Sequence, residues 1–211
     1  MKTCVIFCAG EFDTLVTPLE DAVVIAADGG LTHCLRLGIA PHIILGDFDS
    51  LGYVPEGAQV FPVEKDDTDS MLAVRRGLAL GCRRFVIYGG LEGPRLDHTI
   101  ANLQTLQFLA EQGAQGILVG KTSLATVIFN DCVRFPAAPE GLISVFCMGK
   151  DATGVNIRGL QYELTKGTLT AGFPLGVSNH FIGEKSVISV ENGSLLLIYD
   201  RKIGFPEGAL C

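Results

Sequence analysis

Short apolar runs alternate with helical patterns along the first half of the chain. The apolar runs have the length and β-branched content of buried strands, and they cover residues 3–8, 23–27, 42–45, 60–63, 84–88 and 116–119. Helical patterns lie between several of these runs, at residues 31–37, 70–80 and 97–112. Strands that alternate with helices are typical of a parallel sheet. Residues 1–122 are therefore predicted to form an α/β domain with a doubly wound, mainly parallel sheet.

Local signals refine two of these helices. The helix at 70–80 follows Asp67 and Thr68, whose side-chain oxygens are suitable N-cap acceptors. The helix at 97–112 carries apolar residues at threefold spacing, which predicts a buried stripe made by Ile100, Leu103, Leu106 and Leu109. Both helices are thus expected to pack one face against the sheet.

The pattern changes after about residue 122, where the helical periodicity stops. Strand-like runs separated by turn residues cover residues 126–129, 133–135, 142–148, 154–158, 168–171, 186–190 and 195–199. Asn192-Gly193 between the last two runs is a strong signal for a hairpin turn. Many short strands without helices indicate an antiparallel sandwich or barrel. Residues 123–211 are therefore predicted to form a C-terminal antiparallel β-sandwich domain.

Composition and charge narrow the function without identifying it. Of 211 residues, 48% are apolar and 26 are glycine, which fits a well-packed α/β protein with many tight turns. The net charge of −7 argues against nucleic-acid binding, because a phosphate backbone needs a basic face. A nucleotide remains compatible, since a metal ion and a few local cations suffice for it. The seven cysteines are scattered without a CxxC pair, which argues against a zinc site.

The sequence also shows no signal for a membrane or for export. The N-terminal residues enter a short apolar strand without a cleavable signal pattern. No apolar run reaches the length of about 18 residues that a membrane-spanning helix needs. The sequence thus predicts a cytoplasmic protein that has no membrane partner.

The strongest candidate for chemistry is the segment Ile43-Ile44-Leu45-Gly46-Asp47-Phe48-Asp49-Ser50. Asp47 and Asp49 lie two residues apart, so an extended backbone would direct both carboxylates to the same side. Two anions about 4 Å apart repel by roughly 4 kcal/mol at an effective dielectric of about 20, a cost that a divalent cation removes. Magnesium accepts such oxygens readily. The alternative is a polar turn after a buried strand, because Gly, Asp and Ser are ordinary turn formers.

Other clusters of acidic residues and glycines accompany this segment: Asp28-Gly29-Gly30, Lys65-Asp66-Asp67-Thr68-Asp69, and Gly89-Gly90 with Arg95-Leu96-Asp97-His98. The carboxyl ends of parallel strands meet at one edge of an open sheet, where ligands bind. We therefore expect the clusters to form one site, in which Asp47, Asp49 and Asp69 hold magnesium against a polyphosphate.

Phosphate binding is the second chemistry that these clusters indicate. Their glycines let backbone amides approach phosphate oxygens, and Lys65 and Arg95 supply cations. The chain contains no GxxxxGK[ST] segment, so it has no Walker-type phosphate loop. No GxGxxG follows the first strand, which argues against a dinucleotide site.

Each of these residues also has an ordinary structural explanation. Asp28 fits a turn, Lys65 a solvated surface charge, and His98 a polar contact at a helix N-terminus. The carboxylates before the second helix fit caps or first-turn residues that the helix dipole stabilises: Asp66, Asp67 and Asp69. In the second half, the polar segment at 176–181 fits a loop between strands.

Taken together, the motifs resemble the bacterial thiamine pyrophosphokinase family. The match comprises Ala27 to Gly30, Pro41 to Ser50, Lys65 to Asp69, Gly89-Gly90 with Arg95 to His98, and Gly176-Val177-Ser178-Asn179. The resemblance implies an N-terminal α/β catalytic domain, a C-terminal β-sandwich that helps bind thiamine, and a homodimer with active sites between subunits. It also implies magnesium-dependent transfer of diphosphate from ATP to the hydroxyl of thiamine, with release of AMP.

The resemblance further implies roles for individual residues. Asp47, Asp49 and Asp69 would form the metal and phosphate centre, and Ser178 and Asn179 would face the pyrimidine of thiamine. The nucleotide and its phosphates would contact Asp28, Gly29, Gly30, Lys65, Thr68, Gly89, Gly90, Arg95, Asp97 and His98. The chain departs from the family pattern where a glycine and an acidic residue are usual, at Pro94 and His180.

Two other functions remain compatible with these residues. One is a non-catalytic module that binds thiamine or a nucleotide on the same scaffold, and the other is a related diphosphokinase that acts on a different alcohol. The dense set of aspartates favours an enzyme, because a pure binding protein has less need for an anionic metal site.

Overall fold

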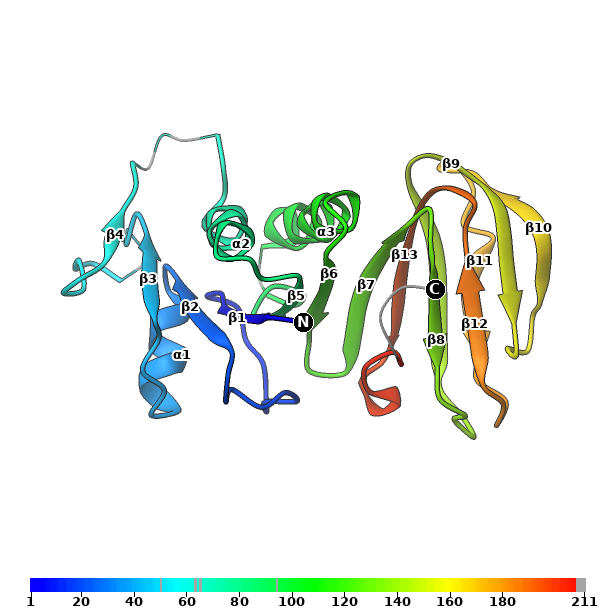
Figure 1. The fold of residues 1–211 in the computed structure, drawn as a ribbon, viewed down its shortest axis with the longest axis horizontal. Helices are drawn as coiled ribbons and strands as arrows, with labels where there is room; N and C mark the ends of the chain where they lie inside the picture. The colour runs from blue at the N-terminus through cyan, green and yellow to red at the C-terminus, as the bar shows by residue number, and fades with distance from the viewer. Residues whose placement is uncertain (50, 63, 65, 94, 208–211) are drawn as a thin grey trace. The chain divides into compact units, whose positions relative to one another are not determined.

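The chain forms two compact units in the computed structural model, which describes residues 1–49, 51–62, 64, 66–93 and 95–207 (Figure 1). Unit 1 is Met1–Lys121, and unit 2 begins at Thr122. Among the described residues, no helix is long and apolar enough to cross a membrane.

Unit 1 is an α/β unit with a parallel sheet, as the alternation of strand and helix patterns predicts. Its strands are β1 (Thr3–Phe7), β2 (Val23–Ala27), β3 (Ile43–Gly46), β4 (Gln59–Val60), β5 (Arg84–Tyr88) and β6 (Gln115–Val119). Its helices are α1 (Gly30–Arg36), α2 (Asp69–Ala79) and α3 (Leu96–Glu111). The strand order is β4-β3-β2-β1-β5-β6, and every pairing in this part of the sheet is parallel.

The core of unit 1 centres on β1, which lies between β2 and β5. Cys4, Val5, Ile6 and Phe7 are fully buried, as are most of the residues that face them from β5. A parallel strand flanked by strands and helices is covered on both faces, so it is apolar throughout rather than alternating. All these strands run parallel, but the order in which they are added to the sheet changes side at β1: β2, β3 and β4 lie on one side of it, and β5 and β6 on the other. The carboxyl ends of the strands at such a switch point form the usual ligand site of this fold class.

The stripe predicted for α3 is confirmed at Leu106 and Leu109 and wrong at Ile100. Ile100 is 52% exposed, and the buried residues of α3 are Asn102, Thr105, Leu106 and Leu109. Residues three apart on an α-helix are rotated by about 60° from one another, so a threefold series moves off any one face within about three turns. Spacings of three and four keep a stripe on the same face, and here that stripe includes two polar residues.

Unit 2 is built from antiparallel strands, as expected. They are β7 (Ser123–Phe129), β8 (Cys132–Phe135), β9 (Leu142–Arg158), β10 (Leu164–Leu169), β11 (Gly176–His180), β12 (Ser186–Ser189) and β13 (Asn192–Asp200), followed by the 3₁₀ turn η1 (Arg201–Ile203). The segment at 176–180, which fits a loop by sequence, is the strand β11. Its neighbour in the sheet is the first part of β9.

The long strand β9 joins two sheets into a sandwich. Its first part pairs with β13 and β11, and its last part pairs with β12 and β10. The strands predicted separately at 142–148 and 154–158 are therefore one strand. Gly149 and Gly154 take left-handed φ angles of 76° and 67° between its two parts, so they bend the strand where a sequence pattern suggests a turn.

The hairpin predicted at Asn192-Gly193 is also wrong. The strands on either side of it, β12 and β13, both pair with β9. Asn192 is the first residue of β13, opposite Thr153, and Gly193 has a φ of 112°.

Aromatic rings pack between the sheets of unit 2. The ring of Phe135 on β8 meets Tyr199 on β13 edge-on, with ring centroids 4.9 Å apart, and Phe181 at 5.5 Å.

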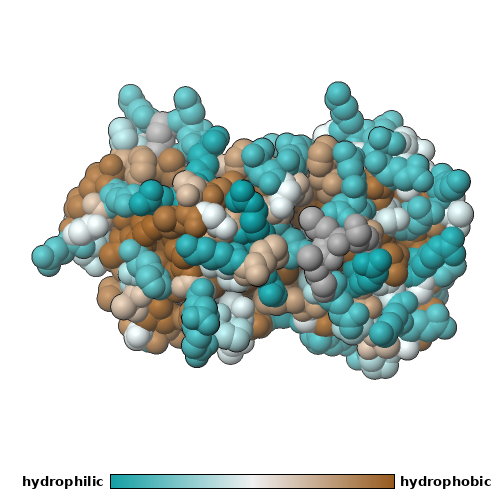
Figure 2. Space-filling model, viewed as in Figure 1, coloured by the Kyte–Doolittle hydropathy of each residue, from teal (hydrophilic) through white to brown (hydrophobic). Residues whose placement is uncertain are grey.

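Apolar side chains are exposed in unit 1 at the end of α1 and between residues 53 and 60: Leu35, Leu37, Tyr53, Val54 and Val60. Figure 2 shows hydrophobic surface on this unit. An open groove in this unit is lined largely by such residues, among them Leu35, Ile39, Ile44 and Tyr53. Of the described residues that line it, only Glu56 is acidic. A single carboxylate does not provide the donor set that a phosphate and metal site needs, so the candidate chemistry lies elsewhere in the unit.

Candidate active site

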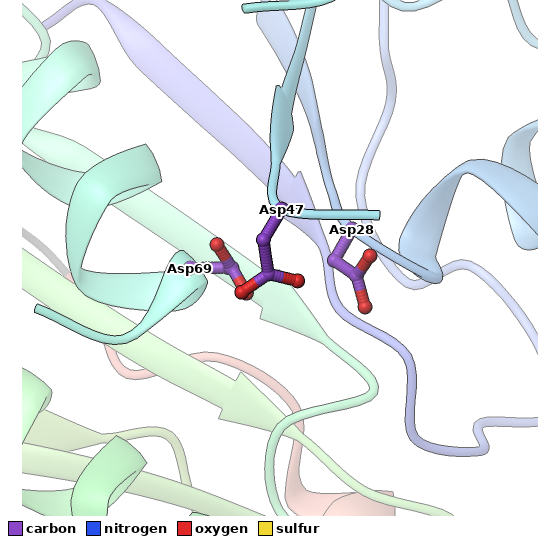
Figure 3. Close-up of side chains that lie close together, drawn as sticks. All are labelled: Asp28, Asp47 and Asp69. Atoms are coloured by element: carbon purple, nitrogen blue, oxygen red, sulfur yellow. The ribbon is translucent and has the colours of Figure 1, made fainter. Parts of the chain in front are cut away.

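Asp28, Asp47 and Asp69 converge at the carboxyl edge of the sheet in unit 1 (Figure 3). Each offers a carboxylate oxygen, and these oxygens lie within 4.8 Å of one another. Asp28 follows β2, Asp47 follows β3, and Asp69 is the first residue of α2. Residues distant in the sequence thus meet because the ends of parallel strands share one edge.

The backbone around Asp28 explains how it enters the cluster. Asp28 has a left-handed φ of 46°, and its N–H donates to the Leu45 carbonyl at 2.8 Å. The chain at Gly46 passes so close that a Cβ there would lie 3.0 Å from Cα and Cβ of Asp28. Glycine at position 46 therefore lets the ends of β2 and β3 approach each other, and this approach places Asp28 beside Asp47.

Asp49 lies outside the carboxylate cluster, in contrast to the expectation from residue spacing. The strand β3 ends at Gly46, and Phe48 between the two aspartates is buried with a left-handed φ of 61°. The backbone between the two aspartates is therefore not the extended one that would direct both carboxylates to one side. Asp49 is exposed, and its N–H donates to Asp47 Oδ1 at 3.4 Å.

The cluster has the donor chemistry of a site for a hard divalent cation. Three carboxylates in such proximity repel one another unless a cation or proton lies among them. Mg²⁺ and Ca²⁺ prefer oxygen ligands, and Mg²⁺ commonly binds few carboxylates together with water and substrate phosphates. The nearby Cys8 thiol is a poor ligand, because burial raises its pKa to about 12 and the charge of Asp69 adds to this rise. The residues present thus fit a magnesium ion.

Thr68 holds the start of α2, as the sequence predicts. It is the N-cap residue, in extended conformation, and its Oγ1 accepts a hydrogen bond from the Met71 N–H at 3.2 Å. Asp67 pairs instead with Arg75 at 2.9 Å and therefore supports the helix rather than the cluster. Lys65, a predicted phosphate ligand, lies outside the described residues.

A buried polar network that sequence reasoning missed lies behind this helix start. The Ser70 hydroxyl donates to Asn102 Oδ1 at 2.6 Å, and Asn102 Nδ2 donates to the Gly90 carbonyl at 2.8 Å. Both side chains are less than a tenth exposed. The one signal in the sequence is a single asparagine within an apolar helical pattern, which by itself does not identify its partners.

The glycines of two predicted phosphate loops are required by close packing. A Cβ at Gly30 would lie 1.8 Å from the Phe7 carbonyl oxygen. Gly89 has a φ of 70°, and a Cβ there would lie 2.4 Å from the carbonyl oxygen of Gly10. Gly29 precedes α1 as its N-cap residue. These glycines bring the loops after β1, β2 and β5 together, and a phosphate contact from them stays a prediction.

Arg95, Asp97 and His98 lie at the start of α3 and are exposed. Arg95 Nη2 pairs with Asp97 Oδ2 at 2.6 Å. The hydrogen bond with Arg95 lowers the pKa of Asp97 below its ordinary value. The same hydrogen bond raises the pKa of Arg95, and the charge of Asp49 contributes to that rise. A phosphate would therefore compete with Asp97 for the guanidinium. Pro94 lies outside the described residues.

The predicted thiamine contacts lie on β11 in unit 2. Ser178 is exposed, with a left-handed φ of 59°, and its N–H donates to Ser144 Oγ at 3.1 Å. Asn179 is 4% exposed, and its side chain bonds the backbone N–H groups of Tyr162 and His180 and the carbonyl of Tyr162. Asn179 therefore anchors this strand to the loop at Tyr162, and contact of either residue with thiamine stays a prediction.

Comparison with known proteins matches both units to one family. Residues 19–118 match the family model described as "Thiamin pyrophosphokinase, catalytic domain", and residues 133–197 match "Thiamin pyrophosphokinase, vitamin B1 binding domain". The chain is 27% identical over 195 residues to the thiamine pyrophosphokinase of Bacillus subtilis (strain 168), covering 85% of this chain and 87% of the relative.

Solved structures agree with this match. The crystal structure of thiamine pyrophosphokinase from Bacillus subtilis is similar with a TM-score of 0.81 and 26% identity, over 94% of this chain and 99% of that one. The structure from Geobacillus thermodenitrificans has a TM-score of 0.76 and 24% identity, over 95% and 97% of the two chains, and it supports the fold.

Proposed function

Because the chain belongs to the thiamin pyrophosphokinase family, it is an ATP-dependent diphosphotransferase, and we propose that thiamine is its acceptor. The hydroxyl oxygen of thiamine loses its proton to solvent and forms a bond to the β-phosphorus of ATP, and the bond between that phosphorus and the oxygen bridging to the α-phosphate breaks, so that this oxygen leaves with AMP. The products are thiamine diphosphate and AMP. The observation that carries this proposal is the convergence of Asp28, Asp47 and Asp69 in a unit that matches the catalytic-domain model.

We propose that these carboxylates hold Mg²⁺. The ion would neutralise the charge of the ATP polyphosphate and of the transferred group. Phosphoryl transfer needs positioning and electrostatic stabilisation more than covalent chemistry by the protein, so the roles of the chain are to bind and to orient. The glycine loop at Gly89–Gly90 and the guanidinium of Arg95 are the proposed phosphate contacts, the latter as a bidentate donor.

Unit 2 supplies the acceptor site in this proposal. The support is the match of residues 133–197 to a vitamin B1 binding domain. Ser178 is the better placed of the two predicted contacts, because its side chain is exposed while the Asn179 amide is engaged with backbone groups.

The family resemblance further supports a homodimer with active sites between subunits. Light scattering tests this, because a dimer has twice the mass of one chain.

The reaction is tested by incubating the protein with ATP, MgCl₂ and thiamine and separating the products by liquid chromatography. The expected result is AMP and thiamine diphosphate in equal amounts, with none formed in excess EDTA. Formation of ADP would contradict diphosphate transfer. If the protein is offered thiamine together with other alcohols, the alcohol that receives the diphosphate identifies its preferred acceptor. The match to a catalytic-domain model disfavours a purely binding role.

A further inference from the structure

We propose that Asn102 is a positioning residue of the active site, acting through Ser70 and Gly90 on the carboxylate of Asp69 and on the Gly89–Gly90 loop. This inference rests on the proposed function and adds to it a residue that touches neither substrate nor metal. Its basis is a chain of hydrogen bonds that links the elements α2, α3 and the end of β5; those of Asn102 are buried, and the one between Thr68 and Ser70 is part-buried.

The carboxamide of Asn102 contacts two site elements at once. It projects from the buried face of α3 and is 7% exposed. Its Oδ1 accepts from the Ser70 hydroxyl at 2.6 Å, and its Nδ2 donates to the Gly90 carbonyl at 2.8 Å. A Cβ at Gly90 would lie 3.2 Å from this Nδ2, so the carboxamide packs directly against the glycine loop.

The hydrogen bonds in this network all donate in one direction, from Thr68 through Ser70 and Asn102 to Gly90. The Ser70 hydroxyl proton is committed to Asn102, so the contact of 3.0 Å between Ser70 Oγ and Thr68 Oγ1 takes its proton from Thr68. Thr68 Oγ1 also accepts from the Met71 N–H. The amide of Asn102 supplies both groups that the network uses, whereas leucine offers neither and an ionised aspartate offers no N–H to Gly90.

The network fixes the residues on both sides of Asp69. Thr68 and Ser70 are each held by their side chains, and Asp69 between them directs its carboxylate toward Asp28 and Asp47. Partners that orient metal ligands commonly change metal affinity by tenfold or more when they are removed. Loss of the Asn102 amide is therefore expected to loosen both the metal site and the loop at Gly90.

Thr105 provides a matched control on the same face of α3. It is 1% exposed, and its hydroxyl donates within the helix to the Ala101 carbonyl at 3.0 Å. Thr105→Val thus removes one buried hydroxyl from the same helix without touching the network. If Asn102 acts only through general packing, Thr105→Val and Asn102→Leu have equivalent effects on the metal site.

The test compares Asn102→Leu, Ser70→Ala, their double variant and Thr105→Val. Steady-state rates with MgATP and thiamine are expected to show kcat reduced about tenfold to a hundredfold in the first two, with the KM for thiamine changed less than about twofold. Calorimetric titration with Mg²⁺ alone is expected to show a dissociation constant raised about tenfold. Thr105→Val keeps both wild-type values, and the double variant loses no more than Asn102→Leu.

Wild-type kcat and Mg²⁺ affinity in Ser70→Ala and Asn102→Leu would overturn the inference, as would an equal loss in Thr105→Val. If Asn102→Leu does not fold, Ser70→Ala still tests the inference, because it breaks the same network with a smaller change in the side chain. Failure of the proposed function would appear separately, as absence of AMP from the wild-type protein. The Mg²⁺ titration, which contains no substrate, then still decides the role of Asn102.

Discussion

The aspartates at positions 47 and 49 differ in how the backbone presents them. Asp47 belongs to the cluster with Asp28 and Asp69, whereas Asp49 is exposed beyond a left-handed Phe48. A bulky residue at positive φ costs about 1–2 kcal/mol. The fold maintains this conformation by burying the Phe48 ring, and the strained turn separates the two carboxylates.

Asp47→Asn is expected to lower kcat/KM by about a hundredfold, because a metal ion contributes several kcal/mol of charge stabilisation that depends on its ligands. Its free energy of unfolding without metal should stay the same or rise, since one of three repelling charges is removed. Asp49→Asn, outside the cluster, should cost less than about tenfold. Steady-state kinetics and urea unfolding in EDTA measure both effects, and equal kinetic losses would show that Asp49 shares the ligand role.

At the scale of single residues, the sequence shows which residues are candidates for a site better than it shows which of them meet in space. Asp47 and Asp69 are predicted to meet because they stand directly after a strand and at a helix start, and both lie in the carboxylate cluster. The sequence assigns Asp28 to the nucleotide instead, since its place in the cluster depends on the contact with Gly46, which spacing does not reveal. The partners of Asn102 depend on three elements and are equally out of reach.

The meeting of β2 and β3 at Gly46 sets the geometry of the carboxylates. Gly46 has a φ of 151°, and a Cβ there would lie only 3.0 Å from Cα and Cβ of Asp28, so a side chain would force the neighbouring backbone to shift. Gly46→Ala is expected to destabilise the protein by about 2–3 kcal/mol through strain and steric overlap, and to lower activity by displacing Asp28. The measurement is urea unfolding combined with product formation under saturating MgATP.

Gly57 offers the control for this substitution. It has a φ of 73°, and a Cβ at this position would meet nothing within 4 Å among the described residues. Gly57→Ala therefore carries only the backbone cost of about 1 kcal/mol, and activity per folded molecule should be unchanged. A Gly46→Ala protein with wild-type activity would mean that the approach of these strand ends does not set the carboxylate positions.

Elements are predictable where one physical signal dominates. Strands β2, β3, β5 and β6 are short apolar runs that end at Gly or Asp, and β2 and β5 have the predicted bounds. The strand predicted at 60–63 is instead the exposed pair Gln59–Val60 of β4. The long strand β9 is not predictable, because Gly149 and Gly154 within it are ordinary turn signals. The strand β11 is polar and lies beside β9, so tertiary pairing rather than local propensity makes it a strand.

At the scale of the molecule, the carboxylate cluster lies entirely within unit 1. A ligand that binds the folded state alone stabilises it by mass action. Mg²⁺ is therefore expected to slow hydrogen exchange of backbone amides around Asp28, Asp47 and Asp69, and to leave the strands of unit 2 unchanged. Hydrogen-exchange mass spectrometry in Mg²⁺ and in EDTA tests this.

Asp47→Asn is the control for this measurement, since its exchange should not respond to Mg²⁺. Protection that appears only in unit 2 would contradict the assignment of the metal site.

The fold class of both halves is predictable because periodicity changes near residue 122, from alternating strands and helices to strands alone. The pairing of the strands of unit 2 cannot be predicted from the sequence, because antiparallel strands of similar composition allow many pairings.

The pairing of β13 with both β7 and β9 has a consequence for synthesis of the protein. β7, the first strand of unit 2 to be synthesised, acquires its antiparallel partner β13 only when that last strand has left the ribosome. Unit 1, whose strands are all complete by residue 119, has its full set of partners much earlier. In the nascent chain, the strands of unit 1 are thus all present while β7 and β9 still lack their shared partner β13.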